Sequence, residues 1–193
     1  MLYHTTALIR LKQVIREGLI PGEMTLAEQV LRTEEAIAEE EETESCSVEA
    51  QNILDMTLGR TSAVYFWRHL NQAYESMAGL KDLGLELIVI EVNPMQIPCN
   101  CSISNVLATD ELYDMYYQGC TGMKIVDYER EQELIEEWEA SFVEYNPMED
   151  YAYYCEVACP CNIPPKAIRA VYTQDRKKLN IKRWLTERKI TEW

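Results

Sequence analysis

Residues 2–22 read LYHTTALIRLKQVIREGLIPG and contain one of the two histidines of the chain. The start of this stretch favours a short β-strand, and the hydroxyl of Thr5 or Thr6 is placed to cap a following helix. Apolar side chains then recur at the spacing of one helical face, at Leu8, Leu11, Val14 and Ile15. Gly18 stands where helices often end in a left-handed residue. The stretch therefore predicts a strand and a helix that ends at Gly18.

The remainder of the chain carries further strand and helix signals. Runs rich in β-branched and aromatic residues predict strands at 62–67, 85–94, 123–128, 151–160 and 167–173. Helix-forming runs predict helices at 70–80, 110–118 and 130–139. Neither an internal repeat nor a Ser/Gly-rich linker interrupts them. We therefore expect an α+β fold, with a mixed central sheet and flanking helices in a single domain over residues 1–193.

The composition excludes several classes of protein. Hydrophobic residues make up 47% of the 193 residues, which indicates a globular core rather than disorder. No run approaches the roughly 18 apolar residues that span a bilayer, and the N-terminus lacks a secretory pattern. We therefore expect a cytoplasmic protein without a membrane partner. The net charge of −15 argues against a general DNA- or RNA-binding protein.

Charge is unevenly distributed along the chain. Residues 33–44 (TEEAIAEEEETE) are strongly acidic with little apolar surface, so we expect an exposed excursion there. Residues 174–193 are rich in lysine and arginine, and we expect them to form a basic C-terminal helix.

Three segments carry a resemblance when they are taken in chain order. They are YHTTALIRLKQVIREGLIPG at 3–22, AVYFW at 63–67 and CEVACPCNIPPKAI at 155–168. Together they resemble the ADP-ribosyltransferase superfamily, and most closely its His-x-Thr branch of DNA-targeting toxins and RNA 2′-phosphotransferases. The resemblance implies an ADP-ribosyltransferase-like fold and NAD as co-substrate. It also implies transfer of ADP-ribose to a macromolecule, as in a toxin or conflict effector with an antidote or regulatory partner.

The resemblance assigns a role to four residues. Cleavage of the nicotinamide–ribose bond develops positive charge on the sugar, which a carboxylate can stabilise; this role falls to Glu156. Tyr65 would stack on the nicotinamide, and His4 would hydrogen-bond a ribose hydroxyl. Thr6 matches the threonine of the His-x-Thr pattern. We therefore predict that His4, Tyr65 and Glu156 meet in one cleft.

Two departures narrow the expected substrate. Tyr154 stands where arginine-modifying members carry Glu or Gln, so modification of arginine is not expected. An RNA 2′-phosphotransferase needs basic groups around an RNA phosphate. Arg60 is the one arginine expected near the three predicted site residues, so this activity is less favoured. The segment 144–154 corresponds to the family's substrate-recognition loop and is aromatic and acidic.

The sequence leaves open a second function, a non-catalytic module that binds a nucleotide or a protein. A further possible function, that of an acidic protein that mimics nucleic acid, is supported by the net charge alone and is the weakest of these hypotheses.

Seven cysteines without a secretory signal predict reduced thiols. Cys99 and Cys101 form one pair separated by a single residue, and Cys159 and Cys161 form another. If the two pairs are neighbours, four thiolates could bind structural zinc. We favour instead buried, reduced cysteines that pack as small apolar residues, and we assign no metal ligand.

Overall fold

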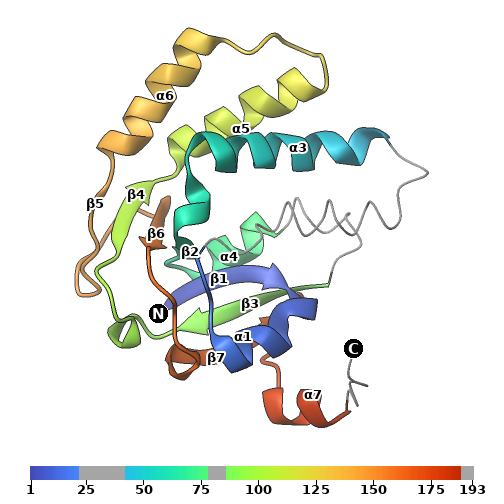
Figure 1. Ribbon diagram of the computed structural model, residues 1–193, viewed down its shortest axis with the longest axis vertical. Coiled ribbons are helices and arrows are strands. Elements are labelled where there is room, and N and C mark those ends of the chain that lie inside the picture. Colours follow the sequence, from blue (N-terminus) through green and yellow to red (C-terminus); the bar gives the residue numbers. More distant parts are fainter. Residues whose placement is uncertain (22–41, 78–85, 188–193) are drawn as a thin grey trace. The chain divides into compact units, whose positions relative to one another are not determined.

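The computed structural model describes residues 1–21, 42–77 and 86–187 (Figure 1). Both helices and strands are present in these ranges, which confirms the α+β class. The chain divides into two compact units. Unit 1 comprises Met1–Leu19, Phe66–Ile97 and Ile163–Trp193, and unit 2 comprises Ile20–Tyr65 and Pro98–Asn162. The single domain expected from the sequence stays a prediction.

Antiparallel strands form the centre of unit 1. β1 (Leu2–Ala7) pairs along its whole length with β3 (Leu87–Val92), which in turn pairs with β7 (Ile168–Thr173). On its other side β1 meets the last residue of β2 (Val64–Trp67), where Tyr3 lies opposite Trp67. All residues of β3 except Glu91 are buried, as its near-continuous apolar sequence requires.

The helix that follows β1 begins later than the sequence predicts. A 3₁₀ turn, η1 (Leu8–Arg10), precedes α1 (Leu11–Glu17), and neither has a side-chain cap. The predicted threonine cap is wrong because both threonines lie inside the β1–β3 ladder. Thr5 instead donates its hydroxyl to the carbonyl of Ala73 at 3.2 Å.

Gly18 ends α1 as predicted. Its φ of +90° and ψ of −164° lie in a region that is essentially restricted to glycine. Leu19 then forms a two-way bridge with Ile163, with N–H···O distances of 3.0 and 2.8 Å. A Cβ atom at Gly18 would lie 1.9 Å from the carbonyl oxygen of Ile163. The glycine is therefore required for both its conformation and its close approach.

The other elements of unit 1 are short. They are α4 (Leu70–Ser76), the 3₁₀ turns η4 (Pro94–Gln96) and η5 (Pro165–Ala167), and α7 (Ile181–Glu187). The basic helix predicted from residue 174 is wrong for 174–180, where the chain turns back on β7. Leu179 N–H donates to the Val171 carbonyl there, and Arg176 adopts a φ of +61°. Residues 188–193 lie outside the described part.

Unit 2 contains β4 (Ser102–Asn105) between β5 (Val143–Glu144) and β6 (Cys155–Cys159), all antiparallel. Every residue of β6 is buried. The predicted strand at 151–160 is therefore right for its second half. β4 and β5 escaped prediction because they are short and lack an apolar run.

Three helices of unit 2 pack together: α3 (Glu42–Thr57), α5 (Leu107–Cys120) and α6 (Tyr128–Ala140). Their buried side chains form one cluster with Leu58, which follows α3; the other members are Ala50, Leu54, Ala108, Leu112, Tyr116, Leu134 and Trp138. The predicted strand at 123–128 is wrong. Met123 and Ile125 are exposed, and Asp127 caps α6 by accepting from the N–H groups of Glu129 and Arg130.

The acidic segment 33–44 falls mostly outside the described residues. Positions 42–44 form the first turn of α3, and 33–41 are not described. The expectation of an exposed excursion therefore stays a prediction for most of the segment.

Candidate functional site

Glu156 is the second residue of β6 and lies opposite Ser104 of β4. Its residue is 4% exposed, although the neighbouring positions of the strand are apolar or cysteine. A carboxylate at such a position needs a partner. Arg60 supplies one: its Nη2 donates to Oε2 of Glu156 at 2.5 Å. The Glu156 carboxylate is therefore paired inside its apolar strand.

Arg60 contacts three other side chains at this position. It opens a 3₁₀ turn, η2 (Arg60–Ser62), directly after the left-handed Gly59, shortly beyond the end of α3. Its Nε lies 3.4 Å from Oδ1 of Asp55. Its guanidinium carbon lies 4.4 Å from the centre of the Tyr65 ring. One cation thus joins two carboxylates and an aromatic ring, all within unit 2 (we call these four residues the Arg60 cluster).

Burial and the neighbouring charges together shift the pKa values of the groups in the Arg60 cluster. Burial raises the pKa of Glu156 above its ordinary value, and Arg60 reduces this rise without cancelling it. Asp55 and Asp110 also raise the Glu156 pKa through charge repulsion. For Arg60, burial lowers the pKa, but the two carboxylates outweigh it and the pKa is raised. Burial is also the main cause that raises the pKa of Tyr65 to about 12. The Glu156 proton is therefore held more tightly than in an exposed carboxyl group.

Ser104 adds an unusual polar atom beside the Arg60 cluster. It is 2% exposed and lies opposite Glu156 in the β4–β6 ladder, so both side chains project to the same face. Its hydroxyl oxygen is buried and has no hydrogen-bond partner among the described residues. Buried polar atoms in folded proteins are normally paired with protein, water or ligand. The Ser104 hydroxyl is thus available to a small polar group at this position.

His4 and Thr6 lie in unit 1, on the same face of β1. The His4 ring is half-buried and meets the ring of Phe66 edge-on, with centroids 5.8 Å apart. Thr6 is 2% exposed. Of the four residues that the resemblance assigns, the structure brings Tyr65 and Glu156 together around Arg60. The convergence of His4 with them stays a prediction.

Sequence reasoning gave Arg60 only a passing role and missed Asp55. Arg60 could have been predicted from the burial expected of Glu156. An acidic residue inside an apolar strand needs a basic partner, and few arginines precede Glu156 in the chain. Asp55 offered no such signal, because an aspartate on a helix is ordinary.

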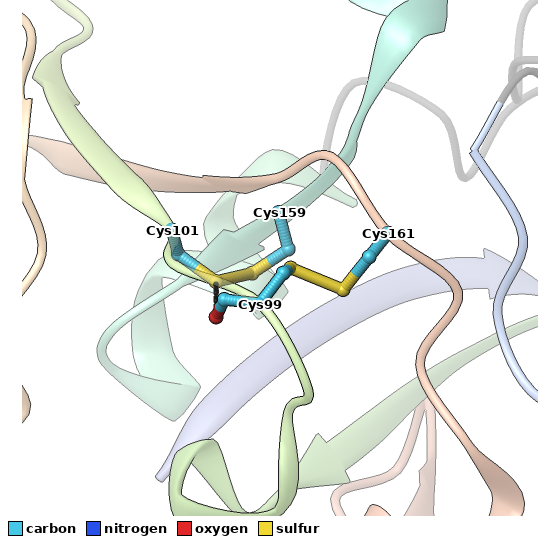
Figure 2. Close-up of a disulfide and its surroundings, with 4 residues drawn as sticks. All are labelled: Cys99, Cys101, Cys159 and Cys161. Atoms are coloured by element: carbon cyan, nitrogen blue, oxygen red, sulfur yellow. Dashed lines mark hydrogen bonds between the residues drawn. A yellow bond between two sulfur atoms is a disulfide. The ribbon is translucent and has the colours of Figure 1, made fainter.

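The four paired cysteines lie in unit 2 and form two disulfide bonds, Cys99–Cys161 and Cys101–Cys159 (Figure 2). The expectation of separate, reduced thiols is therefore wrong for these four, because the two segments lie against each other where β4 begins and β6 ends. Three further cysteines take part in no disulfide among the described residues: Cys46, Cys120 and Cys155.

Comparison with known protein families found no match, and comparison with curated proteins found none. Among the described residues, no helix is long and apolar enough to cross a membrane.

Proposed function

We propose that the protein is an NAD-dependent ADP-ribosyltransferase that modifies a macromolecule. The observation that carries the proposal is the Arg60–Glu156 pair. Two residues that the resemblance assigns independently, Tyr65 and Glu156, contact the same guanidinium although they come from distant segments. A carboxylate held in a fixed position within an apolar environment is the kind of group that stabilises a cationic transition state.

The chemistry of the Arg60 cluster fits this role. Breaking the bond between nicotinamide and ribose places positive charge on the anomeric carbon of NAD. The Glu156 carboxylate would stabilise that charge and accept a hydrogen bond from a ribose hydroxyl. Arg60 would act as a positioning residue, because its contact to Oε2 fixes the orientation of the carboxylate. The unpartnered hydroxyl of Ser104 supplies a further polar contact for the sugar.

The loop 144–154 is the proposed contact for the macromolecular target. It exposes Met148, Tyr153 and Tyr154. A hydrogen bond within the loop orders it, since the Tyr151 hydroxyl accepts from the N–H of Asn146 at 2.8 Å. Aromatic side chains on an ordered loop are suited to stack on a base or a ring. The net charge of −15 would disfavour extended nucleic acid, so a short exposed segment of the target is the better fit.

The proposal places the protein in the cytoplasm, where NAD is available to it, as a toxin or conflict effector. Such an activity calls for an antidote or regulatory protein that restrains it.

A second function, a non-catalytic nucleotide- or protein-binding module, is favoured by one observation. Arg60 and Glu156 have side chains only 14% and 5% exposed, and Arg60 also contacts Asp55. A buried ion pair of this kind can serve the fold alone. The alternative keeps NAD or a partner bound without turnover.

The test uses NAD labelled in the adenylate moiety, incubated with the purified chain and cell lysate. Label that follows protein, DNA or RNA, together with released nicotinamide, supports the enzyme; saturable NAD binding without release supports the module. Three variants assign the roles: Glu156→Gln, His4→Asn, and Glu139→Gln as a control on an exposed carboxylate of unit 2. Transfer lost with Glu156→Gln and kept with Glu139→Gln supports the assigned site. Equal transfer by both contradicts it.

A further inference from the structure

The two disulfides of unit 2 are redundant as cross-links. Cys99–Cys161 and Cys101–Cys159 close loops of similar length, with sequence separations of 62 and 58 residues. They join the same two short segments of chain. Once one bond is formed, the other closes only a ring of a few residues, and the entropy gained from restricting the unfolded chain grows with loop size. The second bond therefore adds little stability, and cross-linking alone does not explain why the chain carries four cysteines here.

The arrangement instead gathers four sulfur atoms at one place. Within each pair the cysteines are two residues apart, and the two disulfides join these positions across the two segments. The Cys101–Cys159 bond joins the residues next to the paired Ser102 and Ala158, and the Cys99–Cys161 bond lies two residues further along both segments (Figure 2). Cys101 and Cys159 are buried, and Cys99 and Cys161 are half-buried. The site is thus shielded on its inner side and reachable from its outer side.

We propose that these four cysteines, when reduced, form a tetrahedral zinc site. Four thiolates in tetrahedral geometry are the ligand set of structural zinc, and zinc–sulfur bonds of about 2.3 Å place the sulfurs roughly 3.8 Å apart. Bonded sulfurs in a disulfide are about 2 Å apart, so each pair needs to open by less than about 2 Å. We expect rotation of the cysteine side chains to supply this change while the β4–β6 pairs from Ser102–Ala158 onward stay in place.

The conversion from disulfides to a zinc site balances in electrons and protons. Each disulfide takes two electrons and two protons from a dithiol reductant, which closes to its own disulfide, and two cysteine thiols result. Zn²⁺ then replaces the four thiol protons, which are released to solvent. In the oxidised form the described residues hold no group of three or more His, Cys, Asp or Glu side chains that could bind a metal ion. Metal binding is therefore controlled by the redox state of these four cysteines.

The experiment compares oxidised and reduced full-length protein. The chain is reduced with dithiothreitol, freed from it by gel filtration under nitrogen, and titrated with Zn²⁺ or with Co²⁺ as a spectroscopic probe. We expect one metal ion per reduced chain, visible absorption bands typical of a tetrahedral cobalt–thiolate centre, and affinity that falls with falling pH as the thiols keep their protons. The oxidised chain should bind no stoichiometric metal.

Variants locate the site. Cys99→Ser and Cys161→Ser alter half-buried ligands and should each lose the cobalt bands, while circular dichroism confirms that the chain remains folded. The double variant C46S/C120S removes two free thiols of the same unit and should bind metal as the parent does. The proposal is overturned if the reduced parent binds no stoichiometric zinc, if it takes up iron in preference, or if metal binding follows Cys46 and Cys120 instead.

Discussion

Arg60 donates a hydrogen bond to Glu156 at 2.5 Å across 96 positions of sequence, and the same guanidinium lies 3.4 Å from Asp55. One buried cation thus faces two carboxylates. The raised pKa of Glu156 is the consequence: burial disfavours its charge, and a single arginine shared with Asp55 does not fully compensate. The stability of unit 2 and the proposed chemistry both depend on this balance.

Replacing Arg60 should destabilise the protein severely. Arg60→Met fills similar volume but leaves Asp55 and Glu156 without their cation. Removal of one partner from a buried ion pair typically costs about 3–5 kcal/mol. Urea unfolding at neutral pH measures the loss. A matched control is Arg130→Met, since Arg130 bonds exposed carboxylates of α5 and α6 and should cost far less.

The loss of unfolding free energy caused by Arg60→Met (the deficit) should also depend on pH. Because the folded-state pKa of Glu156 is raised, the folded protein binds that proton more readily than the unfolded chain does. This contribution to stability is fully present at pH values below the ordinary glutamate pKa of 4.5. It is lost as the pH rises through the raised pKa of folded Glu156. Loss of Arg60 raises the pKa further, so the deficit should be smallest in acid and grow toward neutral pH. A deficit that is the same at every pH would contradict the assignment.

The ring of Tyr65, rather than its hydroxyl, should support Arg60. Tyr65→Phe keeps the aromatic face 4.4 Å from the guanidinium carbon, whereas Tyr65→Ala removes it. Cation–π contacts contribute about 0.5–2 kcal/mol, in addition to the burial of the ring. Thermal unfolding should therefore rank the parent and Tyr65→Phe close together, with Tyr65→Ala clearly lower. If Tyr65→Phe and Tyr65→Ala melt at the same temperature, the ring is not the supporting group.

The elements that were predicted from sequence are those with a long local pattern. The strand that became β3 is a continuous apolar run, and α6 has both an acidic face and the spacing of a helix. The strand predicted at 123–128 failed because apolar residues without a pairing partner do not make a strand, and Asp127 starts a helix instead. β4 consists mainly of polar residues, and only its pairing with β6 makes it a strand.

The candidate site likewise has features that the sequence could predict and features that it could not. Residue types such as Glu156 in an apolar strand could be singled out, because burial of a carboxylate is unusual in itself. The contact between Arg60 and Glu156 could not be derived, since it depends on how η2 and β6 approach each other in three dimensions. The disulfides illustrate the same limit: the spacing of the cysteines was visible in sequence, but their pairing required the register of β4 against β6.

Gly18→Ala should be among the most damaging small changes in unit 1. The residue adopts a backbone conformation that costs other residues about 1–3 kcal/mol, and the added Cβ would meet the carbonyl of Ile163. The Leu19–Ile163 bridge would have to break. Gly122→Ala serves as the control, since its φ is also positive, at +70°, but a Cβ added there would have no atom within 4 Å. Urea unfolding should show a clearly larger loss for Gly18→Ala, and equal losses would show that the close approach is unimportant.

Glu156→Gln separates the catalytic role of Glu156 from its structural role. Glutamine has the shape of a protonated glutamate and keeps an oxygen that can accept from Arg60, while Asp55 still balances the guanidinium charge. The cluster then contains one cation and one anion. We therefore expect a change in unfolding free energy of no more than about 1–2 kcal/mol, smaller than that of Arg60→Met.

The effect of Glu156→Gln on the reaction should be much larger than its effect on stability. Loss of a preorganised charge that stabilises a transition state typically lowers the rate by about 10²–10³, and NAD affinity should change much less, because the contacts proposed for His4 and Tyr65 remain. Labelled NAD gives the transfer rate, and equilibrium binding gives the affinity. A variant that is stable, binds NAD and is slow identifies Glu156 as the catalytic carboxylate. A variant that melts early yet transfers ADP-ribose at the parental rate assigns the Arg60–Glu156 pair to the fold alone, because the negative charge would then have no effect on the reaction.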